Sequence, residues 1–294
     1  MKYIGIQKQI RRNNRKSLLL LFLFPLILVV LALILTGSPE VSFLFICLSA
    51  IWFVIAYFFH NKMIERATSS EAMSRRENPR VYNLLENMCI SQGMEMPKLN
   101  IINDDSLNAF ASGINQETFT VTLSKGIIEK LTDEELEGVI AHELSHIINR
   151  DVRLLMISII FVGIFSFISE MVFRGTSFIG GRSNDGKSNL PFILLAILIS
   201  IVAFFVARLL HFAISRKREY LADAGAAEIT KKPYALASAL RKISGDPYIE
   251  AVTRRDVAQL FMHNPQFTER NLFGNLFSTH PPIEKRIELL EQYV

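Results

Sequence analysis

Four long apolar stretches, three of them without any charged residue, constrain the fold of this chain more than any other feature. The stretches 17–36, 41–59 and 191–207 contain no Asp, Glu, Lys or Arg, and 154–173 contains only Glu170. A helix needs about 20 apolar residues to cross the hydrocarbon layer, within a range of about 17 to 25. Half of the 294 residues are hydrophobic, and the positive mean hydropathy of +0.28 is unusual for a soluble protein. The sequence therefore predicts four transmembrane helices rather than buried helices of a large soluble domain.

The basic residues beside these stretches predict their orientation, because cytoplasmic flanks of membrane spans are enriched in Lys and Arg. The turn at 37–40 between the first two stretches has no basic residue. Basic residues instead precede the first stretch and follow the second and fourth: Lys2, Lys8, Arg11, Arg12, Arg15 and Lys16, then Lys62, Arg66, Arg75 and Arg76, then Arg216, Lys217 and Arg218. We therefore expect a multi-pass protein of the cell (inner) membrane with both termini in the cytoplasm. The net charge of +4 is largely due to these flanks and does not indicate a nucleic-acid partner.

The same pattern divides the chain into five parts. They are a basic cytoplasmic tail (1–16), a first transmembrane hairpin (17–60), a first cytoplasmic segment (61–153), a second transmembrane hairpin (154–214) and a second cytoplasmic segment (215–294). The partners expected from this organisation are the lipid bilayer and whatever substrate reaches the cytoplasmic segments.

The cytoplasmic segments have the local signals of a small α+β domain. Residues 80–92 have a helical pattern, and residues 98–104 and 118–124 are rich in β-branched side chains, which favour strands. Pro233 and Pro282 are placed as first-turn residues of two further helices. We expect a mainly α membrane protein whose α+β cytoplasmic domain is split in sequence by the second hairpin.

The stretch VIAHELSHIINRD (139–151) contains two histidines four residues apart. Thr132 and Glu135 form a capping-box pattern that predicts a helix running through Asn149. On this helix His142 and His146 share a face one turn apart, which is the separation two imidazoles need to bind one zinc ion. Glu143 is rotated by about 100° from His142 and can act on a water at the metal without being a ligand. A separate stripe should be buried: Leu136, Ile140, Leu144 and Ile147.

A catalytic zinc site needs a third protein ligand and one open position. The candidates are carboxylates and the other histidines, His60, His211, His263 and His280. In SRKREYLADAGAA (215–227), Glu219 and Asp223 are again four apart, on a segment that follows the fourth stretch. The third stretch begins just after the motif helix, so a returning hairpin brings Glu219 back beside it. We predict Glu219 as the third ligand and Asp223 as an acceptor that fixes the tautomer of an imidazole; the alternative is a solvated acidic face of a helix.

Four motifs together resemble the HtpX-type membrane zinc metalloproteases, relatives of the CAAX prenyl endopeptidases. They are AHELSHIINRD, SRKREYLADAGAA, NAFASG (108–113) and STHPPIEKRI (278–287). The resemblance implies four spans, a zincin-like catalytic domain and one Zn²⁺ per chain held by His142, His146 and Glu219, with Glu143 catalytic. It also places Asn108 and His280 near the active site. The implied function is quality control, in which damaged or misassembled membrane proteins are cleaved from the cytoplasmic side.

The mechanism that fits these residues is metal-assisted peptide hydrolysis. Glu143 is the expected general base and acid, and His280 is the first choice for stabilising the oxyanion, ahead of Asn108 and Tyr220. The substrate backbone could add as a strand along an exposed edge near 108–123.

Two other functions compete with this one. An intramembrane protease is disfavoured because polar residues flank the motif helix at both ends. A membrane scaffold or transporter with a structural metal would need a site closed by four protein ligands, and Glu143 would then have no purpose.

Overall fold

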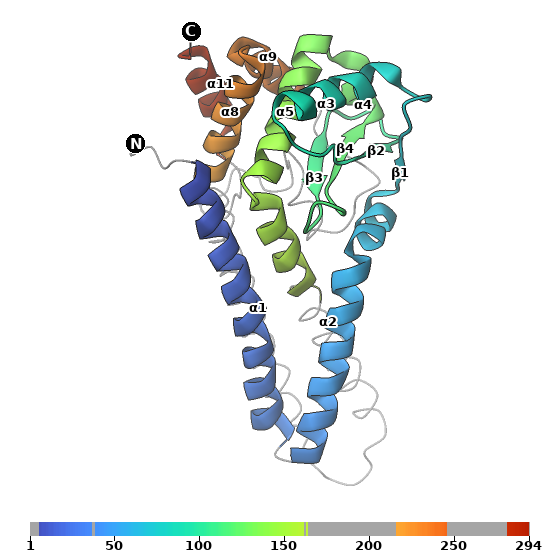
Figure 1. Cartoon of the computed structure of the whole chain (residues 1–294), viewed down its shortest axis with the longest axis vertical. Helices are drawn as coiled ribbons and strands as arrows, with labels where there is room; N and C mark the ends of the chain where they lie inside the picture. Colours follow the sequence, from blue (N-terminus) through green and yellow to red (C-terminus); the bar gives the residue numbers. More distant parts are fainter. Residues whose placement is uncertain (1–5, 37–38, 162, 164–215, 246–280, 294) are drawn as a thin grey trace, which may run out of the picture.

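The computed structural model describes residues 6–36, 39–161, 163, 216–245 and 281–293. These residues form a mainly helical protein with one small mixed sheet. Figure 1 shows two regions, a long helical hairpin and an assembly of the sheet with the remaining helices at one end of that hairpin.

The hairpin consists of α1 (Ile6–Thr36) and α2 (Pro39–Thr68). Residues 151–161 are also helical and lie between α1 and α2 (Figure 1). The ring of Phe161 stacks on Phe53 of α2, with 5.2 Å between the ring centroids.

Two of the four uncharged stretches, 17–36 and 41–59, lie within α1 and α2. The third begins in the helical residues 154–161; most of it, and all of the fourth, lie outside the described residues. In the part of the chain that the structure describes, no helix is both long and apolar enough to cross a membrane.

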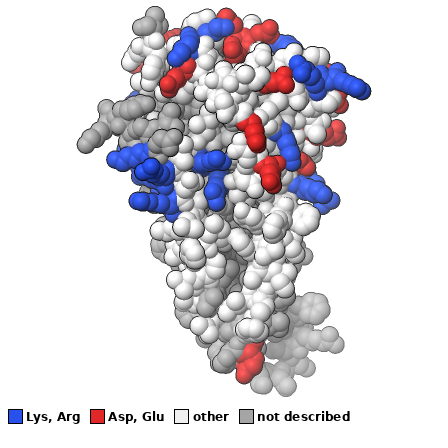
Figure 2. All heavy atoms as spheres, viewed as in Figure 1, with Lys and Arg blue, Asp and Glu red and all other residues white. Residues whose placement is uncertain are grey.

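Apolar and charged side chains occupy different parts of the surface. In the view of Figure 2, Lys, Arg, Asp and Glu gather over the sheet, its helices and the adjoining end of the hairpin, whereas the rest of the hairpin surface is almost free of them. Large apolar side chains are exposed along the hairpin, among them Leu18, Leu19, Phe22, Leu26, Val30 and Leu33 of α1 and Phe43, Ile51, Val54, Ile55, Phe58 and Phe59 of α2.

The sheet has four strands in the order β1-β2-β4-β3. They are β1 (Ser70–Ala72), β2 (Lys98–Ile102), β3 (Ala109–Ser112) and β4 (Thr120–Ser124). β2 and β4 pair in parallel, whereas β1 and β3 pair antiparallel with β2 and β4 respectively. The predicted strands at 98–104 and 118–124 are thus present as β2 and β4, while β1 and β3 were not predicted. β3 forms an edge of the sheet.

Three further helices belong to the segment 61–153. α3 (Pro79–Ser91) lies between β1 and β2 in the sequence, and α4 (Lys125–Lys130) and α5 (Asp133–Ile148) follow β4. α3 agrees with the helix predicted at 80–92 and is capped by Asn78. α4 follows β4 directly, with Ser124 as its N-cap. α5 agrees with the predicted motif helix.

The second segment contributes α8 (Arg216–Thr230), α9 (Pro233–Ile243) and α11 (Ile283–Glu291). Pro233 occupies the first turn of α9 as predicted. The prediction for Pro282 was wrong, because its ψ of 132° is extended and makes it the N-cap of α11 rather than a first-turn residue.

Two glycines allow α5 to pack closely on α8 and α9. A Cβ added at Gly138 of α5 would lie 3.1 Å from the Cα of Leu236 on α9. A Cβ at Gly225 of α8 would lie 2.6 Å from Oγ of Ser145 on α5. The absence of a side chain at Gly138 therefore allows the close approach of α9 to the motif helix, and its absence at Gly225 allows that of α8.

Candidate active site

The motif helix α5 is fixed at its start and along one side. The capping box is present, since the Thr132 hydroxyl accepts a hydrogen bond from the Glu135 N–H and the Glu135 carboxylate accepts one from the Thr132 N–H. The predicted stripe is buried: Leu136, Ile140, Leu144 and Ile147 are each at most 2% exposed. A helix held in this way presents His142 and His146 in a defined direction.

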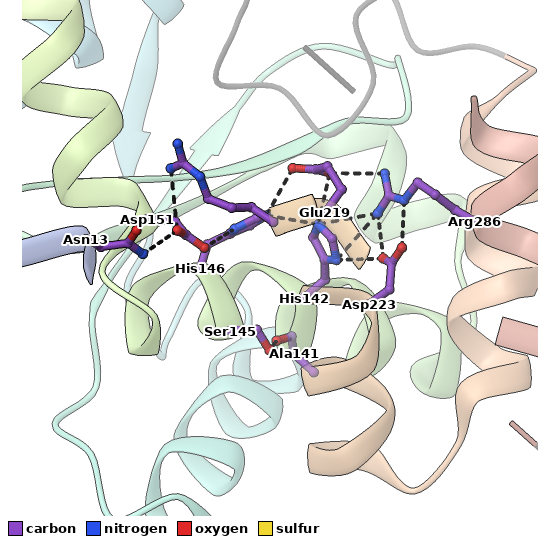
Figure 3. A network of polar contacts seen from close by, with 10 residues as sticks. Asn13, Ala141, His142, Ser145, His146, Asp151, Glu219, Asp223 and Arg286 are labelled. Atoms are coloured by element: carbon purple, nitrogen blue, oxygen red, sulfur yellow. Dashed lines mark hydrogen bonds and ion pairs between the residues drawn. The ribbon is translucent and has the colours of Figure 1, made fainter. Parts of the chain in front are cut away.

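The helix α8 brings Glu219 beside the two histidines (Figure 3). The Nε2 atoms of His142 and His146 are 3.2 Å apart. Glu219 Oε2 lies 3.7 Å from His142 Nε2, and Glu219 Oε1 lies 3.5 Å from His146 Nε2. Among the described residues, these three form the group of His, Cys, Asp and Glu side chains that could hold a metal ion.

The spacing of these donor atoms suits zinc. Two ligands of a tetrahedral zinc ion at about 2.0–2.1 Å are roughly 3.3 Å apart. The three separations on which the site is built, 3.2, 3.5 and 3.7 Å, bracket that value. Two imidazoles and one carboxylate are also the donor set of many catalytic zinc sites, in which a fourth position is left open.

Carboxylates contact the other ring nitrogen of each histidine. Asp223 Oδ1 lies 3.0 Å from His142 Nδ1, and Asp151 Oδ2 lies 3.5 Å from His146 Nδ1. A carboxylate on Nδ1 directs the proton there and leaves Nε2 to bind a metal. The sequence pointed to Asp223 for such a contact but not to Asp151.

Arg286 of α11 is a charged residue of the site that the sequence did not reveal. It is 1% exposed and binds the Asp223 carboxylate with two hydrogen bonds, Nε to Oδ2 at 2.9 Å and Nη2 to Oδ1 at 2.7 Å. Its Nη1 lies 3.3 Å from Glu219 Oε2. The sequence does contain a signal for this residue. Arg286 shares the buried side of α11 with Ile283 and Leu290, and a charged residue among apolar ones on such a side indicates a buried partner of opposite charge.

The charges of the site shift the pKa values of the histidines in opposite directions. Burial lowers the pKa of His142 to about 4, although Asp223 acts the other way. For His146 burial also lowers the pKa, but Asp151 and Glu219 outweigh it and raise the value to about 9. Binding of a metal at His146 therefore releases a proton at neutral pH.

Glu143 is buried next to the metal ligands. It is 3% exposed, and burial, assisted by the charge of Glu219, raises its pKa to about 7. His146, Arg286 and a hydrogen bond from the Ala111 N–H act in the opposite direction. A carboxyl group with a pKa near neutrality suits both acceptance and donation of a proton.

Three residues were predicted to stabilise the oxyanion: Asn108, Tyr220 and His280. Asn108 is 1% exposed at the start of β3, where its carbonyl accepts from Ser124 N at 3.0 Å and its side chain accepts from Ala109 N at 2.9 Å. Tyr220 is half-buried beside Glu219 on α8. His280 lies outside the described residues.

A helix that carries HExxH, joined by a glutamate from a second helix, defines a zinc-peptidase type of site. Comparisons with known proteins agree with this class. The model of peptidase family M48 matches residues 75–294. A protease HtpX homologue of Bacteroides fragilis is 53% identical over the whole of both chains, and one of Tropheryma whipplei is 38% identical over 96% of this chain and 97% of its own.

Among solved structures, the crystal structure of S. mikatae Ste24p resembles this fold with a TM-score of 0.51. The match covers 97% of this chain and 67% of that one at 15% identity, so it supports the fold alone. The chain belongs to peptidase family M48. It is a zinc metallopeptidase whose metal-binding residues are His142, His146 and Glu219.

Proposed function

We propose that this enzyme is an endopeptidase of the cell membrane that cleaves damaged or misassembled membrane proteins at the cytoplasmic face. The observation that carries the catalytic part is the position of Glu143, a buried carboxyl with a raised pKa beside the metal triad. Zinc, when bound, acidifies water and polarises the scissile carbonyl.

Glu143 takes the proton from the attacking water and then delivers it to the leaving amine. Before a metal binds, burial raises the pKa of Glu143 to about 7, which makes this carboxylate a stronger proton acceptor than an ordinary glutamate. Asp223 and Asp151 hold the two imidazoles so that each presents Nε2. His280, Asn108 or Tyr220 is the proposed donor to the oxyanion, where loss of one donor typically lowers the rate by about 10²–10³.

The experiment that tests this assignment is Glu143→Gln in the purified full-length protein. We expect the variant to bind one zinc per chain but to lose about 10²–10⁴ of its peptide-cleaving rate, including self-cleavage after zinc is added to chelator-treated protein. Glu134→Gln, an exposed position on the same helix, is the matched control and should cleave normally. Full activity of Glu143→Gln would refute the assignment.

The peptide substrate is proposed to add as a strand to β3. Asn108 pairs with Ser124 of β4, so by alternation Ala109 and Ala111 direct their backbone groups away from β4. The Ala111 N–H donates to Glu143, so the outer edge of β3 runs beside this carboxyl group, which supports the proposal.

A set of peptides with one N-methylated amide each tests this binding mode. Because each lost backbone hydrogen bond costs about 1 kcal/mol, methylation at alternate amides should lower kcat/KM by roughly fivefold or more, with the intervening amides serving as controls. Uniform effects along the peptide would argue against strand addition.

The proposed membrane location rests on the uncharged stretches and on the apolar side chains exposed along α1 and α2. Exposed apolar surface of this extent is otherwise costly in water. In liposomes, a destabilised membrane protein should be cut in its cytoplasmic loops faster than its stable parent. Equal rates for the two would contradict a role in quality control.

A further inference from the structure

Asn13 is a buried polar residue in the most basic part of the chain. Its neighbours Arg11, Arg12, Asn14 and Arg15 are all exposed, whereas Asn13 is 1% exposed. Ser17 and Leu20, one and two turns further along α1, are buried as well. This face of α1 therefore packs against the body of the protein, and the Asn13 amide is a polar group within it whose partners are known.

The Asn13 amide donates both of its hydrogens to the turn that follows the motif helix. Nδ2 lies 2.8 Å from the carbonyl oxygen of Asn149, which is the C-cap of α5, and 2.7 Å from Asp151 Oδ1. Between these two residues Arg150 has a left-handed φ of 59°. One side chain of α1 thus holds both sides of a tight turn at the end of α5.

Asp151 connects Asn13 to the metal site, because it contacts both Asn13 and His146 (Figure 3). It is a buried carboxylate, 4% exposed, with three partners from different helices. Oδ1 accepts from Asn13 and lies 3.4 Å from Arg218 Nη1, while Oδ2 faces His146 Nδ1 at 3.5 Å. Arg218 directly precedes the metal ligand Glu219 in α8.

We propose that Asn13 is a positioning residue of the zinc site, acting through Asp151 on His146. The amide fixes Oδ1, so that the carboxylate plane keeps Oδ2 directed at the imidazole instead of turning both oxygens toward the Arg218 guanidinium. Loss of a group that contacts a metal-ligating imidazole directly, as Asp151 does, typically changes metal affinity by about 10- to 100-fold, and Asn13 acts one contact further out. The basic amino-terminal helix is therefore part of the metal site. The inference rests on the metal triad and not on the proposed substrate.

Zinc affinity of the full-length protein, measured by competition with a chromophoric chelator, tests the proposal without any activity assay. Asn13→Ala should weaken zinc binding by about 10-fold. Asn14→Ala is the matched control, because Asn14 is the same residue type on the exposed side of the same helix, and it should bind zinc like the wild type. If Asn13→Ala does not fold, Asn13→Ser, which keeps one donor, should show a smaller loss.

A double-mutant cycle separates positioning from a general structural effect. Asp151→Asn should weaken zinc binding by itself, and adding Asn13→Ala to it should change the affinity no further. Wild-type affinity in a folded Asn13→Ala variant would overturn the proposal, as would wild-type affinity in Asn13→Ser where Asn13→Ala does not fold, or additive losses in the double variant. Neither result would affect the assignment of Glu143 or of the metal ligands.

Discussion

Arg286 shows at the scale of one residue how a buried charge organises the site. Its guanidinium joins Asp223 and Glu219, both from α8, while the charge itself comes from α11. Burial alone lowers the pKa of Arg286, but Asp223 and Glu219 outweigh it and raise the value above its ordinary range. Arg286 therefore contributes a cation to two carboxylates that are at most 5% exposed.

Removing the guanidinium should be strongly destabilising. In Arg286→Gln the two carboxylates remain buried without their cation, and loss of one partner of a buried pair typically costs about 3–5 kcal/mol. Denaturant unfolding of the purified protein measures the change. Arg241→Gln is the control, since Arg241 pairs with Glu291 at an exposed position and such pairs contribute at most about 1 kcal/mol. A similar decrease in the free energy of unfolding in both variants would show that the buried ion pairs of Arg286 stabilise the protein no more than an exposed pair does.

At the scale of helices and strands, the position of Glu219 depends on how closely α8 approaches α5. Ser145 directs its hydroxyl to Ala141 O at 2.9 Å, and Gly225 fits against this serine. The contact lies six residues after Glu219 in α8, so a change of packing here shifts the metal ligand.

The substitution Gly225→Ala should destabilise the protein although alanine is the better helix former by about 1 kcal/mol. The new methyl group would lie 2.6 Å from Ser145 Oγ, and overpacking of this kind typically costs about 1–3 kcal/mol. We expect both the Tm of thermal unfolding and the affinity for zinc to be lower than in the wild type.

A second substitution that removes the Ser145 hydroxyl, and with it the close contact to residue 225, provides the control. In Gly225→Ala combined with Ser145→Ala, the hydroxyl is gone and the nearest atom of residue 145 is Cβ at 3.1 Å, so part of the loss should be recovered. An unchanged or more stable Gly225→Ala would mean that α8 can move without consequence.

At the scale of the whole molecule, the metal joins two segments that are far apart in sequence. His142 and His146 lie in the segment 61–153, whereas Glu219 lies in the segment 215–294. Bound zinc therefore stabilises the packing of α8 on α5 in addition to its chemical role.

Removal of the metal with a chelator should abolish cleavage and lower the thermal stability. Zinc at about 100 times its Kd contributes roughly 2.7 kcal/mol, which corresponds to a Tm change of about 4 °C for a chain of this size. Scanning calorimetry with and without zinc measures it. Glu219→Gln should show a much smaller zinc-dependent shift, and an equal shift in that variant would place the stabilising metal elsewhere.

The sequence alone was sufficient for the features that depend on neighbours along the chain. The capping box of Thr132 and Glu135, the buried stripe of α5 and the four-residue spacing of His142 and His146 all act within a few turns of one helix. For that reason the helix and its two ligands were predicted correctly. The prediction of Glu219 required one further assumption, namely that the chain returns through a hairpin to the motif helix.

Only the tertiary structure decided which residues support the ligands. Asn13 and Asp151 are 138 positions apart, and Arg286 and Asp223 are 63 apart. β3 was also missed, because four residues of AFAS have too little pattern to predict a strand. Contacts of this kind depend on how helices and strands pack, and the spacing of residues along one element contains no information about the partner that packing brings to it.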